Sequence, residues 1–163
     1  MLEITGLTRQ FNGRSVLRDI SLRLQAGEYV AIVGESGVGK STLLNLIAGL
    51  DRPDGGHLVL DGVDYSQLDD DALTRLRRDK LGFVFQAFHI LPHLSIRQNV
   101  ALPLWLQGRE RKEADERMVR ALKELDMAER IGERVRSLNG GHRRRVEIAR
   151  SLLNSPKLLL LDE

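Results

Sequence analysis

The first part of the chain has the hydrophobic pattern of strands. Apolar and polar positions alternate along residues 2–9 and 16–24, which predicts two antiparallel strands joined by a turn at Phe11–Arg14. Runs that are almost entirely apolar are typical of parallel strands buried on both faces. Such runs follow at residues 28–33, 81–85 and 157–161. The pattern therefore predicts an α/β fold with a mostly parallel sheet and an antiparallel sheet at its start.

Apolar positions at helical spacing lie between these strands. Helices are predicted from Ser41 to near Gly49, from the acidic residues 69–71 onward, over 95–107 and 110–126, and after His142. A turn at 53–56 and a short strand at 57–60 follow the first helix. The acids at 69–71 are interpreted as a helix cap and not as a metal site. In the last helix four residues are predicted to face inward: Val146, Ala149, Leu152 and Leu153.

Composition adds limits to this picture. A chain of 163 residues has the length of one domain, and 25 basic against 23 acidic side chains leave a net charge of +2. That balance gives no reason to expect a nucleic-acid partner. Cysteine is absent, which excludes disulfides and thiolate metal sites and fits a reducing compartment. No apolar run approaches the roughly 18 residues that a membrane-spanning helix needs, so any membrane association is expected to need a partner.

A glycine-rich loop links the apolar run at 28–33 to the helix that begins near Ser41. Backbone N–H groups surround a phosphate only where no Cβ obstructs them, and three glycines stand in this loop. Lys40 adds a cation for the β- and γ-phosphates, and the Ser41 hydroxyl is a candidate Mg²⁺ ligand. The sequence therefore predicts a P-loop (Walker A). Its predicted ATP-binding residues are Gly34, Glu35, Ser36, Gly37, Val38, Gly39, Lys40, Ser41 and Thr42.

The last apolar run ends in two carboxylates, Asp162 and Glu163. Downstream of a P-loop this pattern predicts a Walker B strand. Its Asp would hold Mg²⁺, and its Glu would orient or deprotonate a hydrolytic water. We therefore predict that Ser41 and Asp162 hold the metal and that Glu163 and Lys40 are catalytic. ATP and Mg²⁺ are the expected ligands.

In this order of motifs, the chain resembles the nucleotide-binding domains of ABC transporters. The resemblance rests on the P-loop, Gln86 at the family's Q-loop position, a helical insert, the Walker B pair, and Asn139-Gly140-Gly141-His142 where the family has its LSGGQ signature. It implies adenine stacking on Phe11, and it adds Gln86 both as a metal ligand beside Ser41 and Asp162 and as a catalytic residue. It also implies a head-to-tail homodimer or heterodimer in which the signature contacts ATP of the other subunit. Residues 86–100 look most like the branch for lipoprotein export, macrolide export and cell division.

The resemblance also implies organisation and location. One domain over 1–163 would have a nucleotide-binding core at about 1–86 and 155–163. A helical subdomain at about 87–154 would carry the signature. The family works on the cytoplasmic face of the cell membrane, docked on a membrane-spanning subunit. We expect the segment 87–106 to supply that docking face, because Phe88, Ile90 and Trp105 look exposed; packing within the helical insert is an equal alternative.

Three departures from the family pattern matter. Asn139 replaces the usual Ser, although its amide still donates hydrogen bonds. His142 replaces the usual Gln and is expected to cap or solvate the helix rather than to bind metal. The sequence ends at Glu163, whereas the family continues through a D-loop, a central strand and a switch histidine. We therefore expect the 163-residue chain alone to bind ATP weakly at best and to hydrolyse it negligibly.

Three other functions stay open on the sequence. One is a non-transport ABC ATPase of the DNA-repair or ribosome-associated kind. The repair kind would have long coiled coils, whereas this insert is short and lacks sustained heptads. An ATP-binding module without hydrolysis is favoured by the missing family segments. A small-molecule P-loop kinase is disfavoured by the signature and the Asp-Glu pair. The transported substrate and the direction of transport are not readable from the residues.

Overall fold

The computed structural model describes residues 1–87 and 89–162. They form two compact units, Met1–Arg77 and Arg78–Glu163, and each is described below by itself. The predicted roles of Phe88 and Glu163 lie outside the described residues.

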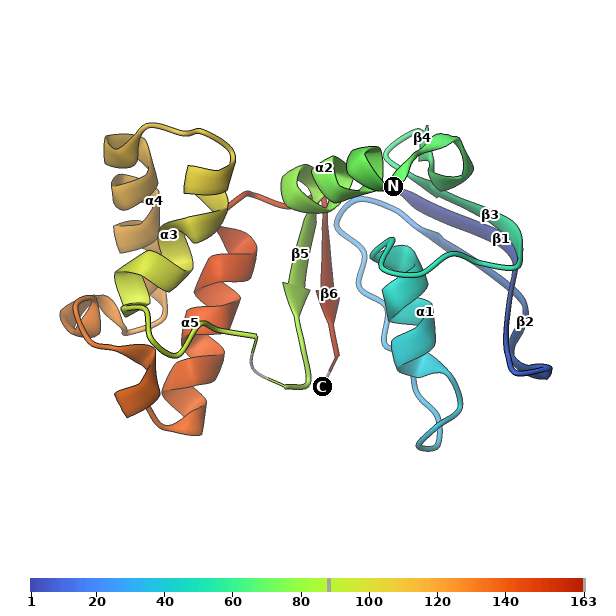
Figure 1. Cartoon of the computed structure of the whole chain (residues 1–163), viewed down its shortest axis with the longest axis horizontal. Coiled ribbons are helices and arrows are strands. Elements are labelled where there is room, and N and C mark those ends of the chain that lie inside the picture. Colours follow the sequence, from blue (N-terminus) through green and yellow to red (C-terminus); the bar gives the residue numbers. More distant parts are fainter. Residues whose placement is uncertain (88, 163) are drawn as a thin grey trace. The chain divides into compact units, whose positions relative to one another are not determined.

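The first unit contains a four-stranded antiparallel sheet in the order β2-β1-β3-β4. Its strands are β1 (Leu2–Phe11), β2 (Arg14–Leu24), β3 (Gly55–Leu60) and β4 (Val63–Asp64). Figure 1 shows β1 and β3 running side by side. Leu2, Ile4 and Leu7 of β1 are buried while the polar positions between them are more exposed. This alternation confirms the predicted antiparallel hairpin.

Helical elements complete the first unit. They are α1 (Lys40–Ile47), the 3-10 turn η1 (Tyr65–Gln67) and α2 (Asp70–Lys80), whose last residues lie past the unit boundary. The Asp69 carboxylate accepts the backbone N–H of Ala72 at 2.7 Å, so it caps α2 as predicted. Leu46 and Ile47 of α1 and Leu73 of α2 are buried.

The predicted strand at 28–33 is wrong for the described structure. These residues form no strand, and Tyr29 and Val33 are 83% and 88% exposed. An apolar segment forms a buried strand only where neighbouring strands supply backbone partners and other elements cover its faces. Within the first unit no described strand pairs with 28–33. Its apolar composition alone therefore does not make it a strand.

The second unit joins a helical cluster to a pair of parallel strands. Its helices are α3 (Ile96–Leu106), α4 (Arg111–Glu124) and α5 (Gly140–Leu152), with short 3-10 turns η2 (Ala128–Arg130) and η3 (Val135–Ser137). Figure 1 shows α3, α4 and α5 grouped together and β5 (Leu81–Val84) beside β6 (Leu158–Leu161). The helix predictions at 95–107 and 110–126 are confirmed, and β5–β6 is the parallel pairing found among the described strands.

The helical core corrects several predicted exposures. Ile90 is buried, and Trp105 is partly buried against the same core, so neither supports an exposed docking face as predicted. Leu152, predicted to face inward, is 44% exposed because the inward face of α5 follows Val146, Ala149 and Leu153. The last strand was predicted to be buried, yet Leu159 and Leu161 are exposed and Leu160 is not. One face of β6 lacks a covering layer within the second unit.

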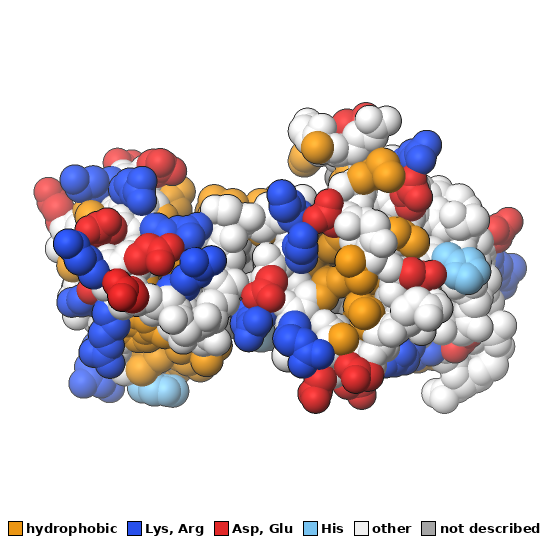
Figure 2. Space-filling model, turned by 90° about the horizontal axis from the view of Figure 1, so that it is seen from above, with side chains coloured by type: hydrophobic (Ala, Val, Ile, Leu, Met, Phe, Trp, Pro, Cys, Tyr) orange, Lys and Arg blue, Asp and Glu red, His pale blue; other side chains and the backbone are white. Residues whose placement is uncertain are grey.

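No helix in the described part of the chain is long and apolar enough to cross a membrane. The face drawn in Figure 2 carries Lys and Arg side chains interspersed with Asp and Glu.

Candidate nucleotide-binding site

The predicted P-loop folds back around its own lysine. Lys40 Nζ donates hydrogen bonds to the carbonyl oxygens of Gly34 and Glu35, at 2.9 and 2.8 Å. The loop residues 34–38 are exposed, and Lys40 begins α1. A cation therefore lies at the mouth of the loop, held by two neutral acceptors that an anionic phosphate would outcompete.

Two glycines of this loop have backbone conformations that other residues rarely adopt. Gly37 has φ 78° and Gly39 has φ 109°. A Cβ on Gly39 would lie 2.9 Å from Val16 Cγ1 and 3.1 Å from Leu17 Cδ2. The loop therefore needs glycine both for its left-handed turns and for its close approach to β2.

The first turn of α1 has no side-chain cap, as is also the case for α4 (Arg111–Glu124). Gly39 occupies the N-cap of α1 and makes no side-chain hydrogen bond, and no acidic residue stands in the first turn. In contrast, α3 has a capping box from Ser95 and Gln98, and Asn139 caps α5. The start of α1 therefore offers a positive dipole end without an acidic side chain beside it, and a phosphate suits that position.

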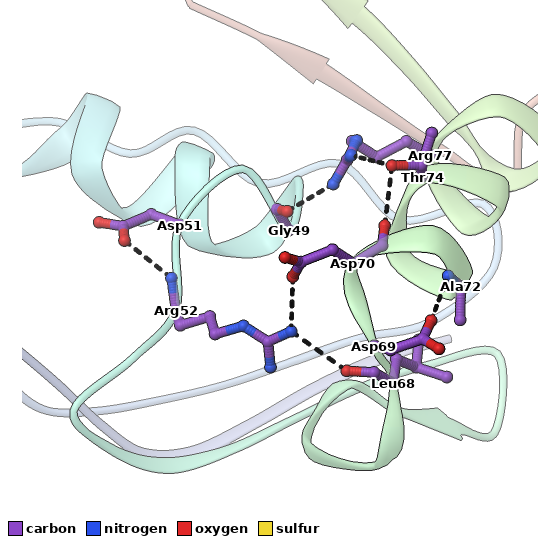
Figure 3. A network of polar contacts seen from close by, with 9 residues as sticks. All are labelled: Gly49, Asp51, Arg52, Leu68, Asp69, Asp70, Ala72, Thr74 and Arg77. Carbon is purple, nitrogen blue, oxygen red and sulfur yellow. Dashed lines mark hydrogen bonds and ion pairs between the residues drawn. The ribbon is translucent and has the colours of Figure 1, made fainter.

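The far end of α1 is anchored by polar contacts (Figure 3). Arg77 Nη1 donates to the carbonyl oxygen of Gly49 at 2.5 Å, and Arg52 pairs with Asp70 at 2.8 Å. The Tyr65 hydroxyl donates to the carbonyl oxygen of Ile47 at 2.8 Å, and burial raises the pKa of Tyr65. These contacts hold α1 against η1 and α2 and so fix the helix on which the P-loop is built.

Phe11, the residue expected to stack on adenine, has an arginine over its ring. The Arg9 guanidinium carbon lies 4.7 Å from the ring centroid, and Phe11 is 44% exposed. Asp51 accepts Arg9 Nε at 3.0 Å and Nη2 at 2.8 Å, and Asp54 accepts Nη1 at 2.9 Å. Arg9 was not predicted as a site residue; its position two residues before Phe11 on β1 was the available signal.

In the second unit, two predicted metal ligands follow neighbouring strands. Leu161 of β6 pairs with Val84 of β5, and the Asp162 N–H donates to the Val84 carbonyl oxygen at 2.9 Å. Gln86 stands two residues after Val84, so Gln86 and Asp162 lie at the same edge of the parallel pair. Ser41 belongs to the first unit, so the structure tests only the Gln86–Asp162 part of the predicted ligand set.

The predicted signature opens α5. Asn139 Oδ1 accepts the backbone N–H of His142 at 2.9 Å, so Asn139 supplies the N-cap. The cap comes from Asn139 and not from the His142 side chain, so of the two predicted roles for His142, capping or solvating the helix start, only solvation stays a prediction. Gly140 and Gly141 form the first exposed residues of α5. The cap uses the Asn139 oxygen, and its amide nitrogen is chemically able to donate to a phosphate.

The residues present fit Mg-ATP by their chemistry. A hydroxyl (Ser41), a side-chain amide (Gln86) and a carboxylate (Asp162) offer the hard oxygen ligands that Mg²⁺ prefers. Clusters of three or more His, Cys, Asp or Glu side chains that could hold a metal by themselves are not found among the described residues.

A comparison with protein families decides the membership. The sequence profile of the family described as "ABC transporter" matches residues 17–163. The chain belongs to this family. Its fold is the P-loop ABC cassette fold, as predicted from the order of its motifs.

Relatives in the ABC transporter family include macrolide export ATP-binding/permease proteins called MacB. The chain is 43% identical to MacB of Burkholderia thailandensis and 44% identical to MacB of Salmonella choleraesuis, over 167 aligned residues. Each alignment covers 100% of this chain and 26% of the relative. The chain thus spans about a quarter of the length of the curated relatives it matches.

Solved ABC structures match along nearly the whole chain. The ATP-binding cassette MJ0796, in a dimeric post-hydrolysis state bound to ADP and Pi, is 37% identical with a TM-score of 0.90. That match covers 100% of this chain and 74% of the other. CbiO1 of Clostridium perfringens, part of the ABC transporter complex CbiONQ, is 29% identical with a TM-score of 0.88, covering 99% and 64%.

Proposed function

We propose that this chain is the ATP-binding part of an ABC transporter ATPase, which binds Mg-ATP on residues 34–42 with adenine on Phe11. One observation carries the proposal: Lys40 lies at the mouth of a glycine loop that opens the uncapped N-terminus of α1. That arrangement supplies a cation, backbone donors and a dipole end for one triphosphate. The ADP and Pi bound to the related cassette MJ0796 support it.

Hydrolysis is proposed to use the predicted metal ligands and catalytic residues. Mg²⁺, when bound, would neutralise charge on the β- and γ-phosphates. Ser41, Gln86 and Asp162 are the proposed ligands, and Lys40 stabilises the charge that develops on the γ-phosphate. Glu163 is proposed to hold the attacking water.

We propose that two copies act together, with Asn139, Gly140, Gly141 and His142 of one copy at the ATP of the other. Gly140 and Gly141 are exposed at the start of α5. Their backbone N–H groups are therefore proposed to donate to the ATP of the second copy. The dimeric state of MJ0796 supports this proposal.

The membrane partner is proposed to dock on the segment 87–106 at the cytoplasmic face of the membrane. Leu91, at 37% exposure, and Leu106, at 66%, supply apolar surface there, now that Ile90 and Trp105 are assigned to the core. The related MacB proteins are described as ATP-binding/permease proteins, and the related CbiO1 is described as part of an ABC transporter complex. Both relatives support a membrane component.

The proposal is tested by mixing two inactive variants of the purified full-length protein that carries this chain. Lys40→Ala removes the P-loop cation but keeps the signature, and Gly140→Asp places a carboxylate in the signature but keeps the P-loop. In a mixed dimer one composite site is intact. An equal mixture should therefore recover about a quarter of the wild-type ATPase rate, because half of the randomly paired dimers carry one working site of two.

Each variant alone should hydrolyse almost no ATP, with phosphate release as the measurement. A mixture no more active than its separate components would contradict the shared site. Full activity of Gly140→Asp alone would remove the signature from the mechanism.

A further inference from the structure

A carboxylate with no assigned function is buried in the middle of α5. Glu147 is 0% exposed. Its Oε1 accepts the backbone N–H of Phe85 at 3.2 Å and of His89 at 3.4 Å, and its Oε2 accepts Arg144 Nη1 at 3.0 Å. A buried carboxylate is costly unless it is paired and hydrogen bonded, and Glu147 is both.

Two arginines of the same helix hold the carbonyl side of this segment. Arg144 Nη1 donates to the Phe85 carbonyl oxygen at 2.6 Å, and Arg150 Nη1 donates to the His89 carbonyl oxygen at 2.6 Å. The backbone at Phe85 and at His89 is thus bound to α5 through both its N–H and its C=O groups. The contacts span 58 to 62 residues of sequence, so chain connectivity does not impose them.

The helix that makes these contacts is itself packed tightly against the strand that precedes the segment. A Cβ on Gly82 of β5 would lie 2.5 Å from the Ser151 carbonyl oxygen of α5, so only glycine fits there. Val146 and Ala149 bury the other side of α5 in the helical core. A movement of α5 should therefore also move β5 and the backbone at Phe85 and His89, because both contact α5 directly.

Gln86 lies between the two anchored residues, and Asn139 and Gly140 open the same α5. We propose that Glu147 is a positioning residue that ties the backbone around Gln86 to α5, so that signature contact and Gln86 position change together. This rests on the proposed function for Gln86 and the signature. Glu147 itself touches no reacting atom; it acts through the backbone of Phe85 and His89.

Three variants of the full-length protein separate positioning from simple stability. Glu147→Ala removes both acceptors, and Glu147→Gln keeps one amide oxygen for the two N–H groups. Ser151→Ala is the matched control, because this buried hydroxyl of α5 donates only within its own helix, to the Ile148 carbonyl oxygen. Hydrogen exchange of the Phe85 and His89 amides and steady-state ATPase kinetics are measured for each.

In Glu147→Ala we expect those two amides to exchange at least about tenfold faster, because their acceptor is lost. We expect kcat to fall about tenfold while KM for ATP changes less than about twofold, because ground-state binding lies on the P-loop. Glu147→Gln should recover part of both losses. Ser151→Ala should change neither.

Unchanged exchange at Phe85 and His89 would overturn the tether. A lower Tm with wild-type kcat would leave Glu147 a structural residue only, and would overturn the positioning role. If Glu147→Ala does not fold, the same two readouts on Glu147→Gln decide, and wild-type values in both contradict the proposal. A wild-type protein that hydrolyses no ATP would instead reject the proposed function, while the exchange measurement still tests the tether.

Discussion

The guanidinium of Arg9 covers one face of the Phe11 ring, with 4.7 Å between the guanidinium carbon and the ring centroid. Asp51 holds that guanidinium through two hydrogen bonds, so the arginine is fixed before any nucleotide arrives. A ring held in place loses less freedom when a base stacks on it. Arg9 is therefore expected to preorganise the adenine contact.

The first prediction is that Arg9→Gln weakens ATP binding about fivefold. A loss of this size is expected when the cation–π contact that holds the Phe11 ring in place is removed. Binding of tripolyphosphate, which has no base, should not change. Calorimetry with both ligands measures this difference. Arg23→Gln is the matched control, because Arg23 forms an exposed ion pair with Glu3 on the same sheet. Equal losses for ATP and tripolyphosphate would show that Arg9 acts on the phosphates or on the fold instead.

The second prediction concerns Tyr65, which supports the end of α1. Tyr65→Phe leaves the buried Ile47 carbonyl oxygen without its donor and should lower the free energy of unfolding by roughly 1 to 2 kcal/mol. Tyr29→Phe is the control, because Tyr29 is 83% exposed and should change nothing measurable. Urea unfolding measures both variants. An unchanged Tyr65→Phe midpoint would contradict the support role.

The same residue predicts a pH dependence. Burial raises the pKa of Tyr65 above its ordinary value of about 10. A group whose pKa is raised on folding stabilises fully below its unfolded pKa, and that contribution is lost as pH rises above it. Wild-type stability should therefore fall above about pH 10 more steeply than that of Tyr65→Phe. Parallel curves for the two proteins would show that Tyr65 does not titrate in this way.

Local chemistry in the sequence was enough to predict the loops and caps. The P-loop at 34–41 follows from glycines, a lysine and a following helix, and the α2 cap follows from Asp69 at the helix start. Both depend on residues a few positions apart, so no long-range partner is needed. The predicted Asp69 cap of α2 is present as the Asp69–Ala72 hydrogen bond, and the structure adds that Gly37 and Gly39 have positive φ.

Features that depend on distant partners were not predictable in the same way. The run at 28–33 has the composition of a buried strand, but strand formation needs a neighbouring backbone that the described unit does not supply. Ile90 looked exposed beside polar neighbours, yet α3 and α5 form the core that covers it. Glu147 has no local sequence signal that separates it from a helix-surface acid, because the backbone N–H groups that donate to it lie about 60 residues away in the sequence.

The central claim is that the loop at 34–41 holds ATP through Lys40. Calorimetric titration of Mg-ATP into the purified full-length protein and into its Lys40→Ala variant tests it most directly. Lys112→Ala, an exposed lysine of α4, is the control, and matching Tm values show that each protein is folded. We predict that Lys40→Ala binds about a hundredfold more weakly or not at all, because the charged contact to the phosphates is lost. An ATP affinity of Lys40→Ala equal to that of the wild type would contradict the account.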